Sequence, residues 1–147
     1  MTTPIVSLSY RSRSTDQVVD RPTLVSILTT SQALNVENDL TGALTFGDGY
    51  FVQVLEGPEA PLMQTMARIR ADARHHSLSI FGPAPIDRRK FPDWCMAYLE
   101  DEPALRPTLS LLCGDWETYG PRASEMLAVV LNDEAVLSPE KPPQSGP

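Results

Sequence analysis

Four polar side chains stand at positions where the surrounding apolar pattern predicts burial, and their types could support chemistry. They are Tyr10, Ser31, Asn35 and Gln53. A phenol can release an electron together with a proton, and a side-chain amide has both a donor end and an acceptor end. A buried polar group without a hydrogen-bond partner costs roughly 1–3 kcal/mol. The four groups therefore either satisfy one another and the nearby backbone, or surround a flat, polar ligand that satisfies them together.

Local patterns predict the elements that must position these side chains. Alternation of apolar residues predicts strands over 5–10, 40–46, 50–56, 78–81 and 94–99, with loops over 11–21 and 82–93. Asp48-Gly49 between two of these strands is typical of a tight hairpin. Apolar spacings of three and four predict one helix over 22–36, with Asp20 as its cap, and a second that ends near Arg74-His75. Along the first helix Ile27, Ser31 and Asn35 share one line.

The order β-α-β-β-α-β-β predicts an α+β fold of the ferredoxin-like type. In this plan two helices cover one face of the sheet. The apolar segment over 105–112 and a helix over 121–131 are expected to cap the other face. We expect three parts: a ferredoxin-like domain over 1–100, a helical cap over 101–135, and a disordered, proline-rich tail over 136–147.

Composition excludes several functional classes. The 147 residues carry a net charge of −7, which disfavours nucleic-acid binding. No apolar run approaches the ~20 residues that a membrane span needs. The chain has two cysteines, Cys95 and Cys113, and two histidines, His75 and His76, and we expect neither a structural zinc site of the usual four-ligand kind nor any other metal. We expect free thiols in a reducing cytoplasm, with Cys95 buried and inert, and a solvated loop at Arg88-Arg89-Lys90.

Several motifs, in order along the chain, resemble those of one family. They are Ser9-Tyr10-Arg11-Ser12, Asn35, Leu40-Thr41-Gly42-Ala43-Leu44, Phe51-Val52-Gln53-Val54-Leu55-Glu56-Gly57-Pro58, Asp72-Ala73-Arg74-His75, Arg89-x-Phe91 and Trp94-Cys95-Met96. Together they resemble a BLUF domain of the short, single-domain type. BLUF domains are blue-light sensors that use FAD. The resemblance runs from about Ile5 to Tyr98 and is specific as an ordered set.

The resemblance implies a flavin held between the two helices. Tyr10 would donate an electron to the excited flavin, Gln53 would bridge Tyr10 and the flavin, and Asn35 would bond the polar edge of the ring. The remaining residues expected at the cofactor are Ile27, Ser31, Leu44, Phe51, Arg74, His75, Trp94 and Met96. Trp94 and Met96 match a pair that competes for the place beside the glutamine. Which of them lies there, and whether the flavin is FAD or FMN, stays open.

The expected function is photoreception and signalling to a separate, unidentified partner protein, without enzymatic turnover. A homodimer is one expected arrangement, because the cap helices are apolar. Two alternatives belong to other classes of protein. One is a flavin-dependent redox enzyme, which would oxidise NADH in the steady state. The other is a cofactor-free ferredoxin-like interaction module, which would be colourless.

Overall fold

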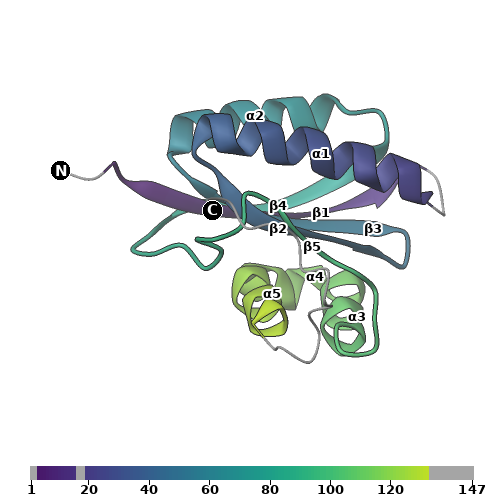
Figure 1. Ribbon diagram of the computed structural model, residues 1–147. Helices are drawn as coiled ribbons and strands as arrows, with labels where there is room; N and C mark the ends of the chain where they lie inside the picture. Colours follow the sequence, from purple (N-terminus) through teal and green to yellow (C-terminus); the bar gives the residue numbers. More distant parts are fainter. Residues whose placement is uncertain (1–2, 16–18, 133–147) are drawn as a thin grey trace.

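A five-stranded mixed sheet forms the centre of the molecule (Figure 1). The computed structural model describes residues 3–15 and 19–132. The strands are β1 (Ile5–Ser14), β2 (Thr41–Gly47), β3 (Tyr50–Gly57), β4 (His75–Ile86) and β5 (Ala97–Leu99), in the order β4-β1-β3-β2-β5. β5 pairs with β2 in parallel, and the other neighbours are antiparallel. This arrangement confirms the α+β, ferredoxin-like prediction.

Helices cover both faces of the sheet (Figure 1). α1 (Arg21–Asn38) and α2 (Glu59–Ala71) lie side by side on one face. α3 (Arg106–Gly114), α4 (Trp116–Tyr119) and α5 (Ala123–Leu131) lie on the opposite face, with a 3-10 turn over Gly120–Arg122. The predicted cap of C-terminal helices is therefore confirmed. The proline-rich tail over 136–147 lies outside the described residues.

The sheet separates two hydrophobic cores because strand side chains alternate between its faces. We call them the site-side core and the cap-side core. The site-side core joins Val6, Leu8 and Tyr10 of β1 to Leu62 and Met66 of α2, among other residues. The cap-side core joins the opposite faces of β2 and β3 to α3, α4 and α5; its members include Ala43, Val52, Val54, Leu109, Leu112, Trp116 and Leu127.

The predicted helix cap and the predicted hairpin turn are both present in the structure. The Asp20 carboxylate accepts a hydrogen bond from the Thr23 backbone N–H at 2.8 Å, which caps α1 one residue before its start. Asp48 and Gly49 have φ values of 54° and 82°. Positive φ at both central residues is what a two-residue hairpin of the right twist requires, so the turn between β2 and β3 is confirmed.

Two strands are longer than predicted. β1 continues through the residues expected to form a loop, as far as Ser14. The guanidinium carbons of Arg11 and Arg13 lie 4.5 and 4.7 Å from the centroid of the Tyr50 ring on β3, so these polar residues gain cross-strand partners. β4 includes Pro83 and Pro85, which were expected in a loop. β4 tolerates them because it is an edge strand, where missing N–H groups break fewer ladder bonds.

The end of α2 also differs from the prediction. The helix stops at Ala71, and His75 begins β4 rather than ending a helix. Ala73, which the prediction placed inside this helix, is exposed in the turn. The Asp72 carboxylate accepts a hydrogen bond from the Arg74 backbone N–H at 2.9 Å. This local bond stabilises a turn in place of another helical turn.

Leu127→Ala in α5 is expected to destabilise the protein by about 2–5 kcal/mol, because it leaves a cavity at a fully buried position. Urea unfolding followed by circular dichroism measures the change. Val129→Ala on the same helix is the matched control, since Val129 is 72% exposed and its truncation should leave the free energy of unfolding nearly unchanged. Equal losses in both variants would contradict the placement of α5 over the sheet.

Candidate functional site

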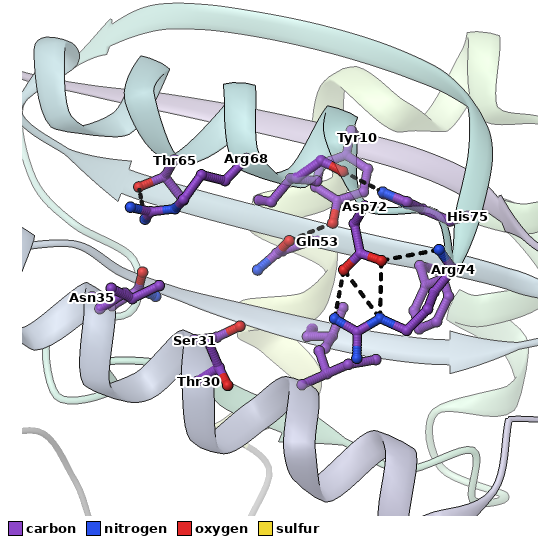
Figure 2. Close-up of a pocket in the computed structure, with 15 residues that line it drawn as sticks. Tyr10, Thr30, Ser31, Asn35, Gln53, Thr65, Arg68, Asp72, Arg74 and His75 are labelled. Atoms are coloured by element: carbon purple, nitrogen blue, oxygen red, sulfur yellow. Dashed lines mark hydrogen bonds and ion pairs between the residues drawn. The ribbon is translucent and has the colours of Figure 1, made fainter.

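A cavity of about 190 Å³ lies between the helices α1 and α2 and the sheet (Figure 2). Its walls combine apolar side chains with convergent polar groups from five elements and from the turn after α2. The residues that line the cavity are Tyr10, Ile27, Thr30, Ser31, Leu34, Asn35, Leu44, Phe51, Gln53, Thr65, Arg68, Ile69, Asp72, Arg74 and His75. Nine of the eleven residues expected at the cofactor are among these, and the two that are not are Trp94 and Met96.

The helical repeat explains how α1 and α2 supply the two sides of the cavity. α1 contributes Ile27, Thr30, Ser31, Leu34 and Asn35, which recur at spacings of three and four and so occupy one face. The side of α2 follows the same spacing with Thr65, Arg68, Ile69 and, one residue past the helix, Asp72.

Sequence reasoning missed some of these lining residues, namely Thr30, Leu34, Thr65, Arg68 and Asp72. The helical periodicity that identified Ile27, Ser31 and Asn35 could have found them. Spacings of three as well as four would have added the missed residues of α1, and the same spacings apply to α2. Polarity concealed the pattern, because Thr65, Arg68 and Asp72 do not look like members of a buried stripe.

Tyr10 and Gln53 form the floor of the cavity. They are directly opposite each other on the neighbouring strands β1 and β3, and Leu44 of β2 is opposite Gln53 on its other side. The Tyr10 hydroxyl donates a hydrogen bond to Gln53 Oε1 at 2.5 Å. Both side chains are buried. The sheet register therefore creates a phenol–amide pair that faces the space between the helices (Figure 2).

The electrostatic environment keeps Tyr10 protonated. Burial, and to a lesser extent the carboxylate of Asp72, raises the pKa of the Tyr10 hydroxyl well above its ordinary value. Asp72 in turn is held ionised, because the Arg74 guanidinium lowers the pKa of its carboxyl. The phenol therefore retains its proton in the resting protein and can donate it along its short hydrogen bond.

Asn35 and Gln53 both contact the chain that precedes β5. Asn35 Nδ2 donates to the Cys95 carbonyl oxygen at 2.6 Å, and Gln53 Nε2 lies 3.6 Å from Met96 Sδ. Gln32, three residues before Asn35 on α1, donates to the Met96 carbonyl oxygen at 3.2 Å. The residues just before β5 are thus tied to the polar edge of the cavity.

Trp94 and Met96 were expected to share a strand face, and this expectation is wrong. β5 begins only at Ala97, so residues 94–96 do not alternate as a strand would. Met96 lies in the site-side core against Gln53, whereas Trp94 lies in the cap-side core on the other side of the sheet. Cys95, expected to be buried, is partly exposed, while Cys113 is buried.

Asp72, Arg74 and His75 line the end of the cavity near the start of β4 (Figure 2). Arg74 Nε lies 2.9 and 3.1 Å from the two Asp72 carboxylate oxygens. His75 Nε2 lies 2.6 Å from the Ile69 carbonyl oxygen, and its Nδ1 lies 2.7 Å from Ser12 Oγ. Because a carbonyl oxygen can only accept, Nε2 carries a proton and donates it to Ile69, while Nδ1 pairs with the Ser12 hydroxyl. The imidazole is therefore fixed in orientation.

This set of side chains suits a flat aromatic heterocycle with one polar edge. Ile27, Leu44 and Ile69 offer apolar walls, and Asn35 and Gln53 offer donors and acceptors toward an edge. Within residues 3–15 and 19–132 no group of three or more His, Cys, Asp or Glu side chains could hold a metal ion. In the same part of the chain, no helix is both long and apolar enough to cross a bilayer.

Comparisons with known proteins agree on one family. Residues 5–97 match the family BLUF, described as sensors of blue-light using FAD. The photoactivated adenylate cyclase subunit beta of Euglena gracilis is 33% identical over 128 residues, which cover 81% of this chain and 15% of that protein. Subunit alpha from Euglena gracilis is 31% identical over 144 residues, or 92% of this chain and 14% of that protein. This chain thus matches only about 15% of the length of these curated relatives.

Solved structures of BLUF proteins share the fold over most of the chain. The dark-state structure of the BLUF protein BlrB has a TM-score of 0.74 and 30% identity, and the match covers 89% of this chain and 97% of BlrB. BlsA in its photo-activated state has a TM-score of 0.70 and 25% identity, with coverage of 97% and 99%. Together with the match over residues 5–97 and the cavity between α1 and α2, these findings show that the chain belongs to the BLUF family of flavin-binding blue-light sensors.

Proposed function

We propose that this protein is a blue-light photoreceptor that binds FAD non-covalently in the cavity between α1 and α2. The observation that carries the proposal is the 2.5 Å hydrogen bond from Tyr10 to Gln53 at the cavity floor, with Asn35 at its edge. When bound, the flavin supplies absorption of blue light and an excited state that accepts an electron. The chain's own residues supply the electron and the proton, and hold the partners in place.

The light reaction proposed for these residues is a reversible proton relay. Tyr10 gives up an electron, and its hydroxyl proton passes along the existing hydrogen bond to Gln53 Oε1. When the electron returns, Tyr10 regains a proton: the one handed back from Oε1 if Gln53 ends rotated, or one released from Nε2 if Gln53 ends as its imidic tautomer. The number of protons on the pair is unchanged, and no bond to a substrate is made or broken. Gln53 is left rotated or in its imidic tautomer, and it then presents a different end of its amide to the ring. A new donor beside a flavin carbonyl shifts the absorption to longer wavelength.

FAD is proposed over FMN because the family that matches the chain is described as using FAD, and a second cavity adjoins the first. A second, smaller cavity shares Ile27, Phe51 and Arg74 with the first and adds Ser14, Val19, Asp20 and Thr23. We propose that this second cavity receives part of the ligand that lies beyond the ring system. Arg68 and Arg74 provide cations along the cavity wall that suit phosphate groups.

We propose that the protein itself is not an enzyme and passes its signal to a separate protein in the cytoplasm. Adenylate cyclases, the activity named for the curated relatives, are one class of effector that this signal could control. The cap helices are the proposed contact surface. Leu111 on α3 is 41% exposed and Val129 on α5 is 72% exposed, so the cap offers apolar side chains to a partner or to a second copy of the chain.

An absorption spectrum recorded in the dark and under blue light tests the function. The purified protein should be yellow and show a small red shift that reverses in the dark, whereas a sample kept dark should not change. A colourless protein would favour the cofactor-free interaction module. Steady-state oxidation of NADH by the flavin-loaded protein would favour the redox enzyme.

Asn35→Ala is expected to weaken flavin retention by about tenfold, because it removes an amide at the cavity edge and leaves the Cys95 carbonyl without its donor. Flavin content per protein after dialysis measures the loss. Asn38→Ala is the matched control on the same helix, since Asn38 bonds the Leu34 carbonyl oxygen within α1 and does not line the cavity. Equal retention in the two variants would remove Asn35 from the proposed binding site.

A further inference from the structure

The chain between β4 and β5, residues 87–96, contacts two residues that line the cavity, and it is neither a helix nor a strand itself. We call it the 87–96 segment. Its far end supplies the Cys95 carbonyl to Asn35 and the Met96 thioether to Gln53, at 2.6 and 3.6 Å. A segment without a hydrogen-bonded ladder of its own must be held in place by other groups, and the same groups then control where Cys95 and Met96 lie.

The near end of the segment is bound by one buried carboxylate. Glu56, at the end of β3, is only 1% exposed. Its Oε2 accepts the Lys90 backbone N–H at 2.8 Å, and its Oε1 accepts the Phe91 backbone N–H at 2.9 Å. The carboxylate thus uses both oxygens on successive backbone donors, and the following side chain, Phe91, is fully buried in the cap-side core.

Arg89 binds the segment to the same corner of the sheet. Its Nη1 donates to Thr41 Oγ1 at 3.0 Å and to the Glu56 carbonyl oxygen at 3.2 Å, and its Nη2 donates to the Asp39 carbonyl oxygen at 2.8 Å. The Arg89 side chain is only 16% exposed, so the expectation of a solvated loop is wrong at this residue. The guanidinium fork joins the segment to the β3 end and to the connection between α1 and β2.

The free-energy cost of burying Glu56 indicates that this residue serves to bind the Lys90 and Phe91 backbone N–H groups rather than to stabilise the fold as a whole. Burial raises the pKa of the Glu56 carboxyl, although the two backbone N–H groups and Arg89 oppose the shift. A charge that is costly to bury adds little to overall stability compared with an apolar residue of the same volume. What an apolar residue could not supply is a pair of acceptors for Lys90 and Phe91.

From this arrangement we infer that Glu56, together with Arg89, is a positioning residue that clamps the 87–96 segment and so keeps Met96 and the Cys95 carbonyl beside Gln53 and Asn35. The inference rests on the proposed function for its photochemical consequence. Gln53 of β3 faces the cavity, and Glu56 lies three residues later, one residue before the end of the same strand. The strand that carries the relay amide therefore also carries the clamp. A looser segment would let Gln53 return to its dark arrangement more easily.

Glu56→Gln tests the clamp with almost no change of shape. An amide has a single acceptor end, so either orientation of Gln leaves one of the two backbone N–H groups facing an NH₂ group. The probe is alkylation of Cys95 by iodoacetamide in the flavin-loaded, full-length protein in the dark, resolved by peptide mass spectrometry. Cys95 should be labelled about tenfold faster in the variant, whereas Cys113, buried in α3, should keep its rate.

Two control variants separate the clamp from loss of charge and from general destabilisation. Glu59→Gln removes an acid from an exposed position in the first turn of α2 and should leave Cys95 labelling unchanged. Leu127→Ala loosens the cap and should accelerate labelling of Cys113 more than that of Cys95. If Glu56→Gln does not accelerate labelling of Cys95, or accelerates both cysteines equally, the clamp is overturned.

Arg89→Lys provides a second test that does not touch the buried acid. It keeps the positive charge but removes the fork that reaches three oxygens, so Cys95 labelling should again rise while Cys113 stays unchanged. Wild-type rates in this variant would contradict the clamp even if Glu56→Gln failed to fold.

A light measurement connects the clamp to the photocycle. Dark recovery of the red shift should be severalfold faster in Glu56→Gln than in the wild type or in Leu127→Ala, and an unchanged recovery rate would remove the positioning role. If the wild type shows no light-induced shift, the proposed function fails, and the labelling experiment still decides the clamp on its own.

Discussion

Tyr10→Phe is expected to abolish the light-induced red shift while the flavin stays bound. Phenylalanine fills the same apolar space in the site-side core but has neither the hydroxyl proton nor the readily oxidised phenol. The substitution removes the 2.5 Å hydrogen bond to Gln53 Oε1. The measurement is the difference spectrum under blue light, with the flavin content of the same sample as the check on binding.

Tyr98→Phe is the matched control for this experiment. Tyr98 lies on β5, next to Leu44 in the register, and is partly buried against the same core, but it does not line the cavity. Burial raises the pKa of Tyr98 to about 12, so it too is a protonated phenol in the resting protein. It should keep the full red shift when replaced. A full shift in Tyr10→Phe, or its loss in both variants, would show that Tyr10 is not the specific donor.

The second large effect is expected at Gln53. Gln53→Leu should also eliminate the red shift, because leucine can neither accept the Tyr10 proton nor present a new donor to the flavin. The buried Tyr10 hydroxyl then loses its acceptor, at a cost of roughly 1–3 kcal/mol in the free energy of unfolding. The difference spectrum measures the first effect and urea unfolding the second.

Gln32→Leu serves as the control for the loss of an amide. Gln32 is a partly buried glutamine that bonds the Met96 carbonyl oxygen from the α1 side and does not line the cavity. Its replacement should preserve the red shift, although it removes an amide bound to the same segment. A normal shift in Gln53→Leu would refute the relay, whatever the outcome for Gln32.

Features set by short-range periodicity were predictable at the level of residues. Tyr10, Ser31, Asn35 and Gln53 were expected to share one space, and all four line the same cavity. This prediction succeeded because the strand repeat and the helix repeat decide which side chains share a face, irrespective of distant contacts. The hairpin at Asp48-Gly49 was equally local, since two residues with positive φ set the turn.

Features that depend on where a strand lies in the sheet, at an edge or in the centre, were not predictable from the sequence. Pro83 and Pro85 look like loop residues, and they occur in a strand only because β4 is at the edge of the sheet. The separation of Trp94 from Met96 has a similar origin. Alternation assumes an extended chain, but the segment before β5 bends, so the two side chains enter different cores.

The sequence by itself determined the order of elements, the faces of the two helices and the polar residues that meet between them, because each depends on neighbours within a turn or a strand. Only the tertiary structure decided that Met96 rather than Trp94 contacts Gln53. Only the tertiary structure decided, too, that Glu56 is buried beneath the 87–96 segment, which carries Met96. Glu56 bonds backbone groups 34 and 35 residues away. No local pattern contains such partners, because they meet only after the chain has closed around the sheet.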